Sequence, residues 1–229
     1  MRLRRILVLA VVCAPLLLNA QTTSMEQQYL QLSQRFEVRD KSLVQDLKDY
    51  LQQYPYTTFE DEVHFMIGVV YAERNAAKQS NKELTQVDAK RLTREHQQML
   101  MFYRAYNNLM MGEYDKALVQ FHALLNEPSY RKHALYGYSY CQYRLGQYDE
   151  ALPGLIEQSQ QKEVPYFLTQ IYYHQHRDTA ATIATHLLTE EVKIKDADYT
   201  SELHRILGEI YYAQGNYQEA ADHLKLIRN

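Results

Sequence analysis

The heptapeptide GEYDKAL, residues 112–118, decides the architecture of this chain because it recurs. GQYDEAL occupies residues 146–152, and GNYQEAA occupies residues 215–221. The interval from Gly146 to Gly215 is close to twice the interval from Gly112 to Gly146. A chain that repeats a unit of about 20–50 residues stacks copies of one supersecondary element. The 229 residues are therefore expected to form a repeat protein.

Each heptapeptide marks a tight turn between two amphipathic helices, since apolar residues recur at helical spacing before and after its glycine. A glycine at the turn adopts the left-handed backbone that a side chain resists. Small residues on each helix let the pair approach to about 8–10 Å, and pairs this small must stack to bury their apolar faces. The turn positions are Gly112, Gly146 and Gly215, and the close-approach positions are Gly68, Ala105, Ala117, Ala151, Ala181, Gly208 and Ala220.

The pattern resembles the tetratricopeptide repeat (TPR), a helix–turn–helix unit with a period of about 34 residues. The resemblance is strongest from Ala105 to Phe121, from Gly146 to Leu155, and in the unit that follows Leu207. It implies an all-α, TPR-like α-solenoid, a right-handed superhelix of antiparallel helix pairs. The residue pattern of 54–75 resembles that of exported bacterial envelope TPR proteins of the outer-membrane assembly and cell-division coordinator type.

Weaker units extend the register to about six helix pairs over residues 21–229. Aligning Ile171–Ala181 with the last unit assigns the close-approach position to Ala181, and Ser80 stands where alanine is usual. Pro153 lies inside a predicted helix, which predicts a bend or a late helix start there. The array is expected to be the N-terminal part of a longer one, and its uncapped last repeat predicts self-association.

Residues 1–20 have the order of a secretory signal peptide. Three arginines precede an almost entirely apolar run over residues 6–18. That run is shorter than the roughly 20 residues that span a bilayer, and cleavage is predicted after Ala20. The mature chain would have no transmembrane span and would keep one cysteine, Cys141, so no internal disulfide can form.

Composition excludes several classes of function. Without residues 1–20 the chain is net acidic and has no basic stripe, which argues against a nucleic-acid partner. The nine histidines show no metal-ligand spacing, and neither a phosphate loop nor a serine elbow is present. We therefore expect no catalytic residue, no metal and no cofactor.

Tyrosine is the unusual residue: the chain has 21, with no tryptophan. In the TPR family the first helix of each pair lines the concave groove. When this family property is carried over by register, it predicts a groove that binds a peptide through aromatic faces and hydroxyls. Tyrosine supplies both and is enriched at binding surfaces. The alternative is that these rings pack one repeat against the next. The candidates are Tyr106, His133, Tyr136, Tyr140, Tyr143, Tyr166, Gln170, Tyr173, Glu209 and Tyr212.

Together these features predict a non-catalytic protein–protein interaction scaffold of the bacterial periplasm or cell envelope, binding an unidentified protein or peptide in the tyrosine-rich groove. Two alternatives stay open. One is a module for glycan or polymer, with tyrosines stacked on sugar rings, and the other is an accessory subunit of an envelope enzyme complex.

Overall fold

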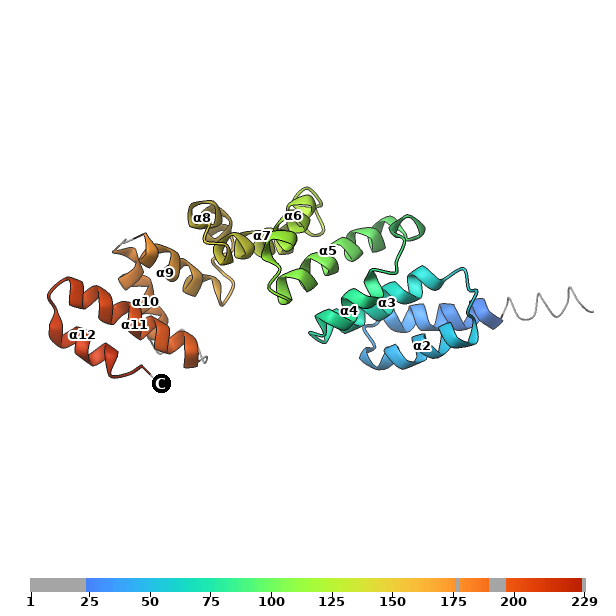
Figure 1. Ribbon diagram of the computed structural model, residues 1–229, viewed down its shortest axis with the longest axis horizontal. Coiled ribbons are helices and arrows are strands. Elements are labelled where there is room, and N and C mark those ends of the chain that lie inside the picture. The colour runs from blue at the N-terminus through green and yellow to red at the C-terminus, as the bar shows by residue number, and fades with distance from the viewer. Residues whose placement is uncertain (1–23, 176–177, 190–196, 228–229) are drawn as a thin grey trace, which may run out of the picture. The chain divides into compact units, whose positions relative to one another are not determined.

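The computed structural model describes residues 24–175, 178–189 and 197–227. Over these residues the secondary structure is helical, with no strand. The predicted signal peptide lies outside the described residues. The chain divides into two compact units, Met1–Glu113 and Tyr114–Asn229 (Figure 1), and each is described by itself.

The first unit packs its helices around one apolar core. That core includes Leu47, Phe65, Ile67, Leu84 and Leu100, each fully buried. Thr93 caps the N-terminus of the last helix of the unit by accepting a hydrogen bond from the His96 backbone N–H at 3.2 Å. The helices are residues 24–37, η1 (Lys41–Leu43), α2 (Val44–Gln53), α3 (Glu60–Glu73), α4 (Ala77–Leu84), η2 (Ala89–Arg91) and α5 (Arg94–Met110).

The second unit is a run of helices in which each packs against the next one along the chain. Apolar clusters lie where α9 meets α8 and where α11 meets α10, so the core is divided among neighbouring repeats. The helices are α6 (Tyr114–Leu124), α7 (Arg131–Arg144), α8 (Tyr148–Glu157), α9 (Val164–His174), α10 (Thr179–Leu188), α11 (Ala197–Ala213) and α12 (Tyr217–Leu224).

The turns between paired helices share one hydrogen-bonded motif. At Gly146 φ is +75°, its N–H donates to the Tyr143 carbonyl at 3.1 Å, and the next N–H donates to the Gln142 carbonyl at 2.9 Å. This is the Schellman ending of a helix, which needs a left-handed residue. The same pair of bonds and a positive φ recur at Arg39, Asn75, Gly112 and Gly215.

Small residues lie where paired helices touch. A Cβ added to Gly208 would lie 2.6 Å from Leu224 Cδ2. Ser80 replaces alanine without loss because its buried hydroxyl donates to the Gly68 carbonyl at 2.7 Å. Gly68 meets Leu84 as Gly208 meets Leu224. Of the predicted close-approach alanines, Ala151 and Ala220 are at most 2% exposed within their pairs, and Ala105 of α5 and Ala117 of α6 are fully buried, each in its own unit.

Two expectations need correction. Ala180 and Ala184, not Ala181, are the fully buried small residues of α10, because residues four apart lie on the same face of a helix. Pro153 does not delay α8, which begins at Tyr148 and continues past the proline to Glu157.

Candidate binding face

Aromatic side chains line one stripe of α7, because residues four apart on a helix share a face. The Tyr136 and Tyr140 rings lie nearly parallel with centroids 6.2 Å apart. Tyr140 in turn contacts Phe167 of α9 at 5.1 Å, and the adjacent Tyr166 lies 5.9 Å from Phe167. Aromatic contacts therefore continue from α7 to α9.

Polar contacts continue the surface from α9 to α11. Gln170 Nε2 donates to the Tyr166 hydroxyl at 3.0 Å and to Glu202 Oε1 at 3.1 Å. Arg205 Nε donates to Glu202 Oε2 at 2.7 Å, and its guanidinium lies 5.4 Å from the centre of the Tyr173 ring. We call the connected set Tyr136, Tyr140, Tyr166, Tyr173, Arg205 and Glu209 the tyrosine row.

Two hydroxyls of this row, those of Tyr136 and Tyr166, remain protonated at neutral pH. Burial raises the pKa of Tyr136 and of Tyr166 to about 12. The Tyr173 hydroxyl donates to the Glu209 carboxylate, and hydrogen bonds from Arg205 lower the pKa of Glu202. The row thus combines neutral donors with Arg205, which pairs with both Glu202 and Glu209, and these groups suit a peptide backbone better than a strongly anionic ligand.

Several predicted groove residues lie elsewhere. Gln170 is only 6% exposed, so it positions Tyr166 and Glu202 from beneath. Tyr143, like Tyr140, is half-buried and 5.1 Å from Phe167, but its ring also contacts Tyr148 of α8 at 6.2 Å, so it packs between α7, α8 and α9. Tyr212 is 65% exposed and contacts Tyr217 of α12 at 5.4 Å.

The remaining candidates have separate surroundings. His133 is exposed at the start of α7. Tyr106 belongs to the first unit, where its hydroxyl donates to Asn75 Oδ1 at 3.1 Å. Its membership of a shared groove stays a prediction.

Sequence reasoning missed Arg144, whose side chain supports Tyr140. Its Nη1 donates to the Tyr140 hydroxyl at 2.8 Å, and its guanidinium lies 4.5 Å from the centre of the Tyr114 ring. The signal was present, because an arginine four residues after a tyrosine can lie over its ring on a helix.

The described residues give no support for a catalytic or metal site. Burial raises the pKa of the Cys141 thiol to about 12, so the reactive thiolate is scarce at neutral pH. Among the described side chains no three of the His, Cys, Asp and Glu type come together to hold a metal ion. In the same part of the chain, no helix is long and apolar enough to cross a membrane.

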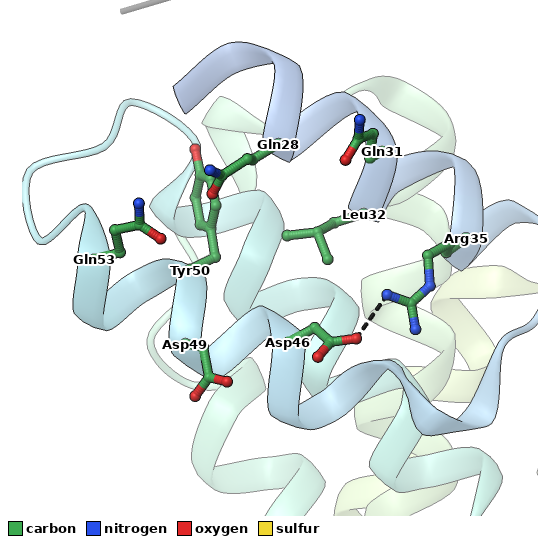
Figure 2. Close-up of a pocket in the computed structure, with 8 residues that line it drawn as sticks. All are labelled: Gln28, Gln31, Leu32, Arg35, Asp46, Asp49, Tyr50 and Gln53. Atoms are coloured by element: carbon green, nitrogen blue, oxygen red, sulfur yellow. Dashed lines mark hydrogen bonds and ion pairs between the residues drawn. The ribbon is translucent and has the colours of Figure 1, made fainter. Parts of the chain in front are cut away.

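A hollow of about 230 Å³ lies in the first unit, between the helix of residues 24–37 and α2. Figure 2 shows amides and carboxylates around it, with Arg35 reaching across to Asp46 at 2.6 Å. The contacts that connect the tyrosine row involve other residues, so this hollow and the row are separate features.

The paired helices and their shared turn motif define an α-solenoid repeat protein. Residues 104–165 and 190–228 match the family model of the tetratricopeptide repeat. These residues therefore carry tetratricopeptide repeats, and the predicted all-α solenoid is confirmed for the described residues.

Solved structures show the same fold at low sequence identity. A structure of MamA from AMB-1 is 18% identical, with a TM-score of 0.58 over 74% of this chain and 97% of that chain. A tetratricopeptide repeat protein from Parabacteroides merdae ATCC 43184 is 15% identical, with a TM-score of 0.59 over 89% of this chain and 78% of that chain. No curated protein sequence matches the chain. TPR proteins are in general non-catalytic scaffolds for protein–protein interaction, and this fold supports that role here.

Proposed function

We propose that this protein is an exported, non-catalytic scaffold that binds a segment of a partner protein along the tyrosine row. The bound segment would lie across α7, α9 and α11, with its apolar side chains against the rings and its carbonyl groups near the hydroxyls. The mechanism is recognition by a preformed surface, so no bond is made or broken.

The observation that carries the proposal is the continuity of the row. Rings link Tyr136 to Phe167, and hydrogen bonds link Tyr166 through Gln170 and Glu202 to Arg205. These side chains are held by one another before any partner arrives. Preorganisation lowers the entropy cost of ordering side chains on binding, and partly buried tyrosines are frequent interface anchors.

The ring geometry favours a protein over a glycan. A sugar stacks on an open aromatic face, yet the Tyr166 ring stacks on Tyr199 with centroids 4.3 Å apart. Tyr136 and Tyr140 likewise stack on each other. Ring edges and hydroxyls are therefore better placed than ring faces to contact a ligand, and they suit a peptide backbone.

Export to the periplasm or cell envelope is supported by the order of residues 1–20: arginines, then an apolar run, then Ala20. The N-terminal sequence of the protein purified from the cells that make it tests this proposal. A mature chain beginning at Gln21 in the exported fraction is expected, and an intact Met1 in the cytosolic fraction would contradict export.

The binding role is tested by placing a photo-crosslinking amino acid at Tyr140 or Tyr173 in those cells. Tyr56 of the first unit, which is 96% exposed, is the matched control position. We expect one partner to be trapped at the two row positions and not at the control. The purified partner should then bind the chain, and Tyr136→Ser/Tyr173→Ser should weaken that affinity at least tenfold.

Adducts of equal yield at all three positions would mean that trapping reflects exposure alone. Unchanged affinity of the double variant for the trapped partner would show that the row is not its binding surface.

A further inference from the structure

The two ends of the tyrosine row differ in charge. At the α11 end Arg205 pairs with both Glu202 and Glu209, each at 2.5 Å, so one cation faces two carboxylates. The three side chains are partly exposed, with 34%, 29% and 42% of their surface accessible. This end of the row therefore presents one uncompensated negative charge to solvent.

The α7 end has the opposite sign. Arg144 is exposed, and its guanidinium lies 4.5 Å from the centre of the Tyr114 ring and 5.7 Å from that of Tyr140. None of the carboxylates that the structure describes pairs with this guanidinium. A cation–π contact orients a guanidinium without neutralising it, so Arg144 presents one uncompensated positive charge.

These two charges lie at the same level of the repeat. Arg144 Nη1 donates to the Tyr140 hydroxyl at 2.8 Å, so the guanidinium lies beside Tyr140 and not one turn beyond it. Tyr140 lies six residues before the turn residue Gly146, and Glu209 lies six residues before Gly215. A segment that crosses α7, α9 and α11 at this level would contact the positive charge at one end and the negative charge at the other.

The separation of the two charges sets a spacing in the bound segment. The Tyr140 ring contacts Phe167 of α9, and Tyr173 of α9 contacts the guanidinium of Arg205 on α11. Helices in side-chain contact lie about 8–10 Å apart, so the two steps from α7 to α11 cover about 16–20 Å. An extended chain advances about 3.3 Å per residue, which makes this distance about five or six residues.

We propose that the tyrosine row binds an extended segment of a partner protein with an acidic side chain beside Arg144 and a lysine or arginine at the α11 carboxylates. The two charged residues of the segment are about five or six positions apart, with apolar side chains between them against the rings. This inference rests on the proposed function of the row. The charges orient the segment and select against one of opposite charge order, because complementary charges give an interface specificity.

A random library of 12-residue peptides, selected on the whole protein, tests the inference. Both ends of each peptide are joined to the carrier protein, so that no peptide offers a terminal carboxylate. The enriched sequences should carry an acidic and a basic residue at the stated spacing. Selection on Arg144→Glu should replace the acidic preference by a basic one, and Glu209→Lys should replace the basic preference by an acidic one.

Affinity measured on one enriched peptide gives the magnitude. Arg144→Glu should weaken binding at least fivefold, and exchanging the acidic residue of the peptide for lysine should restore binding to that variant. Lys132→Glu is the matched control, since it makes the same charge change at an exposed position of the same helix, and it should alter neither the selection nor the affinity. If Arg144→Glu does not fold, Arg144→Gln should abolish the acidic preference instead.

The outcomes separate this inference from the function on which it rests. Absence of enrichment, or enrichment that persists on Tyr136→Ser/Tyr173→Ser, would contradict binding along the row itself. Enrichment that depends on the row but lacks the paired charges, or is unchanged by Arg144→Glu, would overturn the charge pattern alone. Enrichment only from a second library with free C-termini would show that Arg144 binds a terminal carboxylate, which also overturns the acidic side chain.

Discussion

At the scale of single residues, Gly68 and Gly208 occupy equivalent positions with different neighbours. An added Cβ would lie 2.2 Å from Leu84 Cδ2 at Gly68 and 2.6 Å from Leu224 Cδ2 at Gly208. Leu84 is fully buried and cannot move aside, whereas Leu224 is 42% exposed and can. Adding one methyl group should therefore change the free energy of unfolding by different amounts at the two glycines.

We predict that Gly68→Ala lowers the free energy of unfolding by about 1–3 kcal/mol, the usual cost of overpacking. Gly208→Ala should be close to neutral, because the helix propensity gained, about 1 kcal/mol, offsets the displacement of Leu224. Urea denaturation of the two variants measures both values. Equal losses at the two sites would mean that Leu224 is as constrained as Leu84.

A second residue-scale contrast concerns two histidines at one repeat position. His64 Nδ1 lies 2.7 Å from Glu83 Oε2, whereas His204 Nδ1 lies 2.9 Å from His223 Nδ1, with Tyr211 stacked on His223. Burial, and secondarily the neighbouring imidazole, lower the pKa of His204 below its ordinary value near 6.5. The neutral form is therefore favoured in the folded state.

Because the folded pKa is the lower one, the unfolded chain binds protons more readily, and this stabilising contribution is complete above about pH 6.5 and is lost as the pH falls. The amide protection factors of α12, which correct for the slower intrinsic exchange at lower pH, should therefore fall between pH 7.5 and pH 5.5. His223→Glu, which recreates the His64–Glu83 pairing, should reduce that loss of protection. His186→Gln, at an exposed histidine of α10, should not. The same loss of protection in all three proteins would assign the effect to other groups.

At the scale of helices and turns, three of the turns could be predicted from the sequence because each contains a glycine. The sequence could not reveal the turns at Arg39 and Asn75, which adopt φ of 60° and 58°. Their conformation is imposed by the two hydrogen bonds that end the preceding helix and by the packing of that helix on its partner. Neither cause has a local sequence signature.

The register of α10 was predicted wrongly for a related reason. Residues 179–185 read TAATIAT, so neighbouring alanines fit the close-approach position equally well, and only the packing of the helix decides between them. Ala180 and Ala184 are the two that become fully buried.

The cost of a side chain at the turn can be isolated at Gly146, since an added Cβ would meet nothing within 4 Å. Gly146→Ala should destabilise the protein by about 1–2 kcal/mol, the cost of a left-handed non-glycine residue. Gln147→Ala, at the exposed neighbour, should change stability by less than about 0.5 kcal/mol. Thermal denaturation followed by circular dichroism compares the two. A silent Gly146→Ala would mean that the turn relaxes to another conformation.

At the scale of the whole molecule, the sequence predicted most of the candidate site, since Tyr136, Tyr140, Tyr166, Tyr173 and Glu209 of the tyrosine row were among the candidates. The stripe Tyr136–Tyr140 follows from helical spacing, and its place on the first helix of a pair follows from the resemblance to the TPR. The link from Gln170 through Glu202 to Arg205 could not be predicted, because it depends on which side chains of α9 and α11 face each other. Tyr143 shows the same limit: it lies on the predicted stripe, yet its ring also contacts Tyr148 of α8.

This division predicts which tyrosines hold the fold and which bind. Tyr148 stacks on His174 and packs against the α8–α9 core, so Tyr148→Ser should lower the melting temperature by several degrees. Tyr136→Ser/Tyr173→Ser should lower partner affinity and change the melting temperature less. Both properties are measured on the same preparations. Loss of folding in the double variant with a silent Tyr148→Ser would place the row in the core.

Stability in a stacked array is shared between neighbouring repeats, and the second unit should show this directly. Ile171 on α9 is 0% exposed within the cluster that also contains Leu155 of α8. Ile171→Ala should cost about 2–5 kcal/mol through lost contacts and the cavity left behind. Because α9 packs on both α8 and α10, amide protection should fall in all three helices. Ile156→Ala on α8, where the side chain is 51% exposed, should leave protection unchanged. Protection lost in α9 alone would show that each helix of this unit unfolds independently of its neighbours, and the solenoid would then lack the coupling that its shared clusters imply.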